Sequence, residues 1–477
     1  MHTEDFYIRR TGVLLHPTSL PSGKLDGDVE RWLAFLQQCD FSVWQVLPLG
    51  EPQIDLSPYQ CVSAFALNPV LLDEYPAVDK HSSAYQSFCE KHQSWLFDYA
   101  LFKILKSRFQ QAPWYHWPDK YKFRDESVLH TVRAEHQPRL DEICWQQFCL
   151  YNRWQQIKTL AATKNILLFG DIAIFVAHDS VDVWACPQHY LLDENGMMTV
   201  VAGVPPDYFS ATGQRWGNPH YNWDLMQAED FSWWVDRLNY HFELFDLVRI
   251  DHFIGLDAVW MIPAEAETAI DGYYQKVPGK ALLETVRRVT GHLPLVAEDL
   301  GIITDAVRTL KHQFHLPGMA VLQFGFDEHD DNPHKIKNIH SDCVVYTGTH
   351  DNDTTLGWYQ KMDATMREKV LQQLGISYDK HLLSDPRLQN TAKQPHYGNQ
   401  VVDGMIQAAM HSAASLCVFP LQDCLHLGST ARMNIPGTEN HNWTWRFKWE
   451  QINAALSTQM KQWVMQSNRE QPQPVLE

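Results

Sequence analysis

Basic residues are scarce in this sequence relative to acidic ones. Lys and Arg number 39 against 57 Asp and Glu, which gives a formal net charge of −18. A surface of this sign repels nucleic acid and anionic lipid, so neither is expected as a partner and a neutral or cationic substrate is favoured. No apolar run is long enough to span a bilayer, and the opening segment MHTEDFYIRRTG lacks an apolar leader. The sequence therefore predicts a cytoplasmic protein without a membrane partner.

Recognisable cysteine and glycine motifs are also missing. The nine cysteines are scattered, and none of them forms a C-x-x-C pair. An odd, unpatterned set of this kind is typical of free thiols and argues against a zinc site or a disulfide scaffold. No P-loop and no G-x-G-x-x-G stretch follows an apolar run, so the sequence gives no support for nucleotide binding.

Short apolar runs recur along the whole chain and indicate its fold class. They are nearly continuous in Val, Ile, Leu and Phe, which is typical of parallel strands covered on both faces, and helix-like segments separate several of them. Strands alternating with helices in this way favour an α/β fold, a (β/α)8 TIM barrel, with a doubly wound open sheet as the alternative. The eight runs are residues 12–17, 41–49, 165–176, 245–253, 293–300, 318–326, 343–351 and 415–421.

Two of the connections between these runs are too long to be simple loops. Residues 51–164 are rich in tryptophan and helical in pattern, and residues 177–244 are rich in loop-forming residues. The strand series resumes after each of them, so both are interpreted as insertions into one barrel. We predict a single domain over residues 1–465 and a flexible C-terminal tail over residues 466–477, which is polar and contains proline.

Three of the predicted strands end in acidic residues, namely Asp251, Glu298 and Asp351. In a (β/α)8 barrel the C-terminal ends of the strands meet at one face, so these side chains are expected to converge. Converging carboxylates suit glycosyl transfer, with one nucleophile and one general acid, although they could also bind a divalent metal. Metal-dependent hydrolase barrels usually place a His-x-His pair after the first strand, and this chain has His16 alone, which weakens the metal alternative.

Charged residues also interrupt two of the apolar runs. Arg249 precedes Asp251 by two residues, so both side chains lie on the same face of the strand. A buried charge is costly unless it is paired, so they form either a structural ion pair or a reactive carboxylate held ionised by its arginine. Asp171 lies inside another run and is equally consistent with a buried structural acid or a substrate contact.

Aromatic residues make up 12% of the chain, and some of them cluster in loops beside amide and guanidinium side chains. These clusters are SPYQ at 57–60, DYFSATGQRWGNP at 207–219 and NHNWTWRF at 440–447. Aromatic faces stack on the apolar faces of sugar rings, although most such residues simply anchor loops to the core. Trp216 stands in a glycine-rich loop flanked by proline, where the sugar-binding interpretation is stronger.

A series of motifs in order from residue 12 to about residue 446 resembles one enzyme family, the 4-α-glucanotransferases. These enzymes are also called amylomaltases or disproportionating enzymes and form glycoside hydrolase family 77. The motifs are GVLLHPTSLPSG, SPYQ, FGDIAIFVAHDSVDVWA, GVPPDYFSATGQRWGNP, RIDHF, AEDLGIIT, LPGMAVLQF, GTHDNDTTLGW and GSTARMNIPGT.

The resemblance implies a (β/α)8 barrel of the α-amylase type with insertions, and a reaction that needs no metal and no cofactor. Segments of α-1,4-glucan would pass between maltooligosaccharides, or between starch or glycogen chains, by a retaining double displacement through a covalent glucosyl-enzyme. Donor and acceptor glucans are then the expected partners. An α-glucan hydrolase remains an alternative because it shares the fold and the acids, and a catalytically silent glucan-binding protein is an alternative from another class.

Matched motif by motif, the resemblance also implies roles for individual residues. Asp251 would be the nucleophile, Glu298 the general acid and then the general base, and Asp351 the transition-state stabiliser that binds ring hydroxyls. Arg249 would keep Asp251 ionised and oriented, as a nucleophile requires. The substrate-binding residues that the resemblance implies are Arg249, His350, Asp171, Tyr59, Trp216, Gln214 and Asn218.

Overall fold

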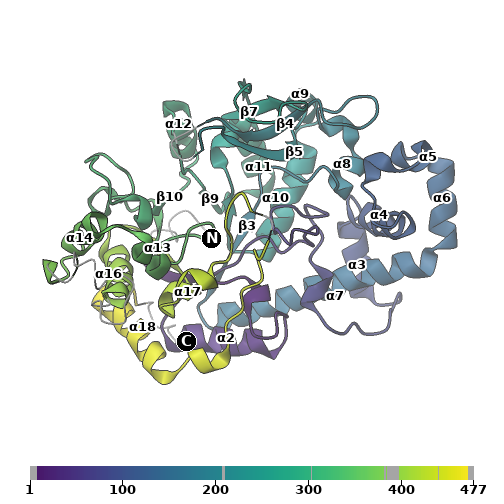
Figure 1. The fold of residues 1–477 in the computed structure, drawn as a ribbon. Helices are drawn as coiled ribbons and strands as arrows, with labels where there is room; N and C mark the ends of the chain where they lie inside the picture. The colour runs from purple at the N-terminus through teal and green to yellow at the C-terminus, as the bar shows by residue number, and fades with distance from the viewer. Residues whose placement is uncertain are drawn as a thin grey trace.

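The computed structural model describes residues 8–206, 210–301, 303–380, 383, 397–438 and 440–470. Within them, eight parallel strands form one sheet in the order β10-β11-β12-β1-β2-β3-β6-β9. These strands (Figure 1) are β1 (Arg10–Leu14), β2 (Val43–Gln45), β3 (Leu167–Ile172), β6 (Leu247–Ile250), β9 (Leu295–Ala297), β10 (Gly318–Val321), β11 (Cys343–Tyr346) and β12 (Leu416–Pro420). Each of them overlaps one of the eight predicted runs.

The two outer strands of this order come together and nearly close the barrel. The backbone amide of Ala297, at the end of β9, donates to the carbonyl of Pro317, just before β10, at 2.8 Å. Apolar side chains from all eight strands then fill the interior: Leu14, Val43, Phe169, Leu247, Val296, Met319, Val344 and Leu416. The predicted (β/α)8 barrel is therefore confirmed, and the open sheet is not what the chain forms.

Helices alternate with the barrel strands and follow the sequence pattern closely. In α11 the side chains of Leu282, Leu283 and Val286 are buried, and the helix stops at Gly291, whose φ of 78° is left-handed. The helices that flank the barrel are α2 (Gly27–Gln38), α10 (Ser232–Leu244), α11 (Gly279–Thr290), α12 (Asp305–Gln313), α13 (Thr355–Lys361), α14 (Ala364–Gln373), α16 (Gly398–His411), α17 (Leu421–Cys424) and α18 (Ala454–Gln466).

Residues 51–164 contribute a group of helices beside the barrel, on the right of Figure 1. The long helix α7 connects this group to β3 and carries Trp154, whose buried indole donates to the carbonyl of Leu244 at 2.9 Å. Tryptophans thus anchor the helical group to the barrel. Its helices are α3 (Ser83–Lys91), α4 (Leu96–Arg108), α5 (Asp119–Lys122), α6 (Glu126–Glu135) and α7 (Gln137–Thr163).

A second, antiparallel sheet stands above the barrel in Figure 1 and was not predicted from the sequence. Its order is β5-β4-β7-β8, with β4 (Val200–Val204), β5 (Gln214–Pro219), β7 (Ala258–Pro263) and β8 (Tyr273–Lys276). The segment 177–244, expected to be loop-rich, therefore holds two strands besides α8 (Val181–Ala185), α9 (Trp223–Ala228) and α10. β5 reads QRWGNP, a polar stretch with glycine and proline that forms a strand only because β4 lies beside it.

The segment 466–477, predicted to be flexible, includes two buried residues, Ser467 and Arg469. Arg469 is fully buried, and its guanidinium donates to the backbone carbonyls of Arg10, Met410 and Ala414. The flexible-tail prediction is therefore wrong for this arginine, because its guanidinium satisfies carbonyls near the N-terminal ends of β1 and β12; residues 471–477 lie outside the described residues. Among the described helices, none has the length and apolar character needed to cross a membrane.

Candidate active site

The register of β3 against β6 brings a carboxylate and a guanidinium together at the mouth of the barrel. Phe169 pairs with Leu247 in the apolar interior, and two residues further along Asp171 pairs with Arg249. Residues at i and i+2 share one face of a strand, so Asp171 and Arg249 lie one layer above that interior. Asp251 follows β6 and adds a second carboxylate beside Arg249.

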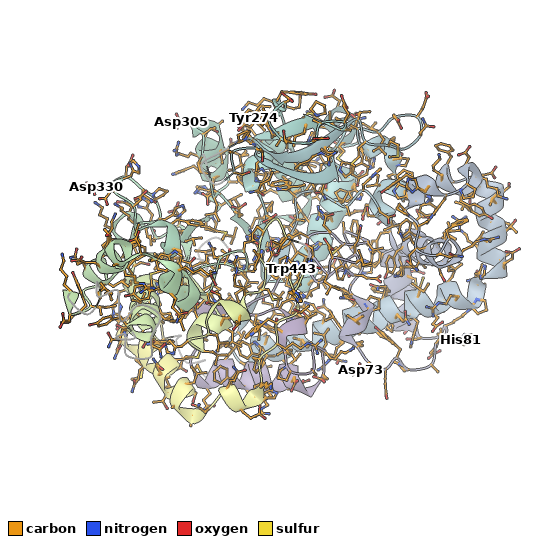
Figure 2. The ribbon with its side chains drawn as sticks, viewed as in Figure 1. Asp73, His81, Tyr274, Asp305, Asp330 and Trp443 are labelled. Atoms are coloured by element: carbon orange, nitrogen blue, oxygen red, sulfur yellow. The ribbon has the colours of Figure 1, made fainter. Side chains whose placement is uncertain are left out.

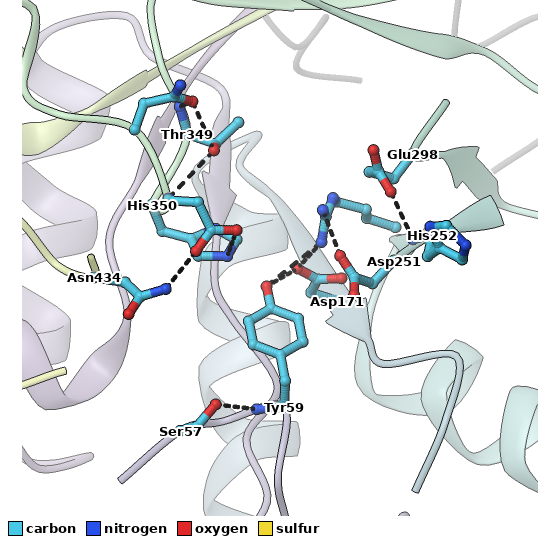
Figure 3. A network of polar contacts seen from close by, with 12 residues as sticks. Ser57, Tyr59, Asp171, Asp251, His252, Glu298, Thr349, His350 and Asn434 are labelled. Carbon is cyan, nitrogen blue, oxygen red and sulfur yellow. Dashed lines mark hydrogen bonds and ion pairs between the residues drawn. The ribbon is translucent and has the colours of Figure 1, made fainter. Parts of the chain in front are cut away.

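Arg249 bridges these two carboxylates (Figure 3). Its Nη1 atom lies 2.6 Å from Oδ2 of Asp171, and its Nη2 atom lies 2.7 Å from Oδ1 of Asp251. The side chain of Asp171 is fully buried, whereas that of Asp251 is 31% exposed. The ion pair considered from the sequence is therefore present, and Asp251 is the member of the trio that a ligand can reach.

Asp171 is a buried acid, and one of its two carboxyl oxygens has no hydrogen-bond partner among the described residues. Its Oδ2 atom also accepts from the hydroxyl of Tyr59 at 2.7 Å, while its Oδ1 atom is buried without a hydrogen-bond partner. Burial raises the pKa of Asp171 to about 6, although the neighbouring Arg249 opposes the shift. An unsatisfied buried acceptor is costly, and because the side chain of Asp171 is fully buried this oxygen is out of reach of a ligand in this geometry.

Glu298 follows β9 and is fixed by the backbone on both of its oxygens. Oε2 accepts from the amide of His252 at 2.7 Å, and Oε1 accepts from the amide of Leu300 at 2.9 Å. Burial raises its pKa to about 7, Arg249 opposes that shift, and Asp251 adds to it. A carboxyl group with this pKa is available in both protonation states near neutral pH, as general acid–base catalysis requires.

Asp351 follows β11 and is held by two side chains. Its Oδ1 accepts from Nδ2 of Asn434 at 2.6 Å, and its Oδ2 lies 3.3 Å from Nε2 of His350. Desolvation opposes its ionisation, but the charge and hydrogen bond of His350, with that of Asn434, hold the pKa of Asp351 well below its usual range. Burial likewise disfavours the charged His350, yet Asp351 raises its pKa overall. The two residues thus form a charged pair opposite the Arg249 trio.

Aromatic rings join the two halves of this cluster. The ring of Tyr59 stacks on His350 with centroids 5.2 Å apart, and its hydroxyl reaches Asp171 on the other side. Trp443 lies 6.1 Å from Tyr59 and 5.7 Å from His350 between ring centroids. Figure 2 shows Trp443 near the middle of the molecule, whereas the other labelled residues lie toward its edges. Aromatic residues from two of the three loop clusters, Tyr59 and Trp443, therefore lie beside the acids.

The three residues expected on the 207–219 loop take different positions. Trp216 lies edge-on to His252 with centroids 4.9 Å apart, and its indole donates to Gln214 Oε1 at 3.1 Å. Gln214 is exposed, whereas Asn218 is buried and its amide is engaged by Gln60 and the carbonyl of Val176. Residues 207–209 of this loop lie outside the described residues.

Two contributors to this cluster were not singled out from the sequence, Asn434 and Trp443. Both belong to quoted motifs, but nothing in a linear sequence shows that residue 434 meets residue 351 across 83 positions. In the described part of the chain, no group of three or more His, Cys, Asp or Glu residues is arranged to hold a metal ion. The carboxylates instead surround a guanidinium, a set that suits polar organic substrates.

Comparison with known proteins relates this chain to one enzyme family. The family described as 4-alpha-glucanotransferase, glycoside hydrolase family 77, matches residues 14–76 and 74–452. The 4-alpha-glucanotransferase of Thermus thermophilus is 41% identical over 92% of this chain and 94% of that protein. The corresponding protein of Synechocystis is 39% identical over 94% of this chain and 96% of its own length.

Solved structures agree with the sequence comparison. The amylomaltase from Streptococcus agalactiae in complex with acarbose superposes with a TM-score of 0.87 and 28% identity, over 97% of this chain and all of that chain. The amylomaltase from Corynebacterium glutamicum shares the fold at a TM-score of 0.74 and 16% identity, over 97% of this chain and 76% of that chain. With a family match over most of its length and full-length relatives at about 40% identity, the chain belongs to the 4-alpha-glucanotransferase family.

Proposed function

We propose that the carboxylates at the barrel mouth carry out this family's reaction, the transfer of α-1,4-glucan segments, by a retaining double displacement. The observation that carries the proposal is that two carboxyl groups near Arg249 have different environments. One accessible carboxylate, Asp251, is fixed by the guanidinium, while Glu298 is buried and has a pKa of about 7. Two carboxyl groups whose environments differ in this way suit a nucleophile and a general acid.

In the first half of the reaction, Asp251 attacks the anomeric carbon of the donor glucan. Arg249 holds its Oδ1 atom at 2.7 Å, which orients the carboxylate and leaves Oδ2 as the attacking atom. Glu298 delivers its proton to the glycosidic oxygen as that bond breaks, and the leaving portion of the glucan departs. The sugar is then bonded covalently to Asp251. Retention requires the two carboxyl groups to be about 5–5.5 Å apart, and we expect this spacing here.

Backbone amides hold the carboxyl group of Glu298 in place for this proton transfer. Each of its two oxygens accepts from one amide, at 2.7 and 2.9 Å. A carboxyl oxygen has two lone pairs, so each oxygen keeps one position at which the proton can be carried and passed to a substrate oxygen. The amides of His252 and Leu300 therefore orient the carboxyl group without blocking its role as the acid.

Asp351 holds the sugar, and Asp171 supports the site from a buried position. Asp351, ionised beside His350, accepts hydrogen bonds from ring hydroxyls and stabilises positive charge that develops on the sugar. Asp171 is fully buried and acts through Arg249 and Tyr59, whose positions it fixes. Tyr59, which touches both His350 and Asp171, offers an aromatic surface between them. The glucan held in this way is neutral, which agrees with the acidic surface of the chain.

In the second half, the 4-hydroxyl of an acceptor glucan must react in preference to water, which is present in vast molar excess. This requires an occupied acceptor site that positions the hydroxyl and excludes water. Trp216 and Gln214 on β5 stand beside His252 and supply an aromatic face and an amide for this purpose. Water attack instead of acceptor attack would make the chain an α-glucan hydrolase, and no turnover would indicate a glucan-binding protein.

Incubation with maltotriose separates these functions. We expect glucose and longer α-1,4 oligosaccharides to form while the number of reducing ends stays nearly constant, since each transfer breaks one glycosidic bond and makes another. A steady rise in reducing ends with only shorter products would establish hydrolysis. Unchanged maltotriose, together with measurable binding by calorimetry, would establish a binding protein and overturn the proposed transfer.

A further inference from the structure

The loop that follows β12 supplies an arginine that links two parts of the candidate site. This loop, residues 427–446, passes the C-terminal ends of the barrel strands as the yellow segment of Figure 1. Its residue Arg432 is partly buried, with 16% of its side chain exposed. Within the described residues the guanidinium forms no hydrogen bond or ion pair with Asp251 or Glu298, so the mechanism above does not use it.

Arg432 donates hydrogen bonds to two backbone carbonyls that belong to partners in the site. Its Nη2 atom donates to the carbonyl of Asp351 at 2.9 Å, and its Nε atom donates to the carbonyl of Asn434 at 3.0 Å. The side chains of these same two residues meet at 2.6 Å, where Nδ2 of Asn434 donates to Oδ1 of Asp351. One planar guanidinium therefore fixes the distance between two backbones whose side chains form a short hydrogen bond.

The position of Arg432 is itself defined by a buried acid. Nη1 of Arg432 lies 3.9 Å from Oδ2 of Asp353, whose side chain is 8% exposed. The same Oδ2 accepts from the hydroxyl of Ser429 at 2.8 Å and pairs with Lys361 on α13. The loop and the segment after β11 are thus braced against each other on both sides of Asp351.

We propose that Arg432 is a positioning residue for the transfer reaction, which it serves by holding Asn434 against Asp351. The inference rests on the role proposed for Asp351. Arginine is suited to this task because its donors lie in a rigid plane and can reach two carbonyls at once, whereas lysine presents a point charge on a flexible stem. If the guanidinium is removed, the loop and Asp351 remain present but their relative position is no longer fixed.

The test is a double-mutant cycle on glucose release from maltotriose, with Arg432→Gln, Asn434→Ala and the combined variant. Arg432→Gln should lower kcat by about tenfold or more with a smaller change in KM, since misplaced site residues cost rate before they cost binding. Arg432→Lys should have a kcat between that of Arg432→Gln and that of the unmodified protein. Because Arg432 acts through Asn434, the combined variant should be no slower than Asn434→Ala within about twofold.

Arg367 provides a matched control for loss of a guanidinium. It also donates to two backbone carbonyls, those of Tyr359 and Gln360, but these lie at the end of α13 away from the acids. Arg367→Gln should leave kcat and KM unchanged even if it lowers the melting temperature. A melting-temperature measurement also shows whether Arg432→Gln folds. If that variant does not fold, Arg432→Lys takes its place in the cycle.

Two results would overturn the inference. One is an Arg432 variant that loses thermal stability but keeps the kcat of the unmodified protein. The other is a combined variant whose rate loss is the product of the two single losses, which would mean that Arg432 and Asn434 act independently. Glucose is released by transfer and by hydrolysis alike, so the cycle still decides this question if the proposed transfer itself proves wrong.

Discussion

Replacing Glu298 by glutamine is expected to make the protein more resistant to unfolding at alkaline pH while strongly lowering turnover. Burial holds the pKa of Glu298 at about 7 instead of 4.5. As the pH rises from 4.5 to 7 the unfolded chain therefore loses this proton while the native protein keeps it. The native state binds more protons in that window, so the free energy of unfolding falls as the pH rises. The loss is complete above pH 7 and amounts to about 3 kcal/mol.

Glutamine has no such titration, so the comparison of two pH values isolates the effect. Its amide oxygen can accept from only one of the amides of His252 and Leu300, and its NH2 group then faces the other donor, which costs about 1–3 kcal/mol at every pH. That offset cancels when the melting temperature of Glu298→Gln relative to the unmodified protein is compared at pH 5 and at pH 8. From pH 5 to pH 8, the free energy of unfolding of Glu298→Gln relative to that of the unmodified protein then rises by about 2–3 kcal/mol. For 477 residues the entropy of unfolding is about 1 kcal/mol/K, so the relative melting temperature should rise by about 2–3 °C.

Scanning calorimetry at the two pH values measures this change directly. Glu265→Gln serves as the matched control, because Glu265 is exposed and its substitution should shift the melting temperature equally at both pH values. A relative melting temperature for Glu298→Gln that is the same at pH 5 and pH 8, or lower at pH 8, would refute the reasoning. It would mean that the native protein does not hold the Glu298 proton above the pH at which the unfolded chain releases it.

Three further outcomes are expected from activity measurements. The basic limb of the pH–rate profile should lie near pH 7, where Glu298 loses its proton, and should vanish in Glu298→Gln; an unchanged profile would contradict its role as the acid. Asp251→Asn should reduce turnover by several orders of magnitude yet still bind maltotriose in calorimetry, because it removes a covalent nucleophile and leaves the rest of the site. Trp216→Ala should raise the ratio of reducing ends to longer products formed from maltotriose, and an unaltered ratio would exclude it from the acceptor site.

The barrel was predictable because its strands are nearly continuous apolar runs. Strands covered on both faces need such runs, and each of the eight overlaps a strand of the structure. The barrel geometry also implied that the acids after β6, β9 and β11 would share one face. The small antiparallel sheet was not predictable in the same way. Its strand β5 is polar, and its strand pair β4–β7 joins segments on either side of a barrel strand.

The site was predictable in its acids but not in the contacts that tune them. Arg249 and Asp251 could be paired from their spacing, whereas the bond from Arg249 to Asp171 depends on the register of β3 against β6. The bond from Asn434 to Asp351 depends on a loop that returns after 83 residues. These contacts form only in the closed barrel, so the order of residues in the sequence does not predict them.

In the proposed mechanism, the charges at the barrel mouth also explain how one carboxyl group, that of Glu298, would serve as acid and then as base. Asp251 is among the groups that raise the pKa of Glu298, while Arg249 lowers it. When a sugar is bonded to Asp251, that negative charge is gone and the effect of Arg249 on Glu298 is no longer opposed by it. The pKa of Glu298 must then fall, just after Glu298 has given up its proton to the leaving group. The carboxylate is thereby favoured at the moment when an acceptor hydroxyl has to be deprotonated. As Glu298 takes that proton, the acceptor oxygen attacks the anomeric carbon and displaces Asp251, which restores the original charges.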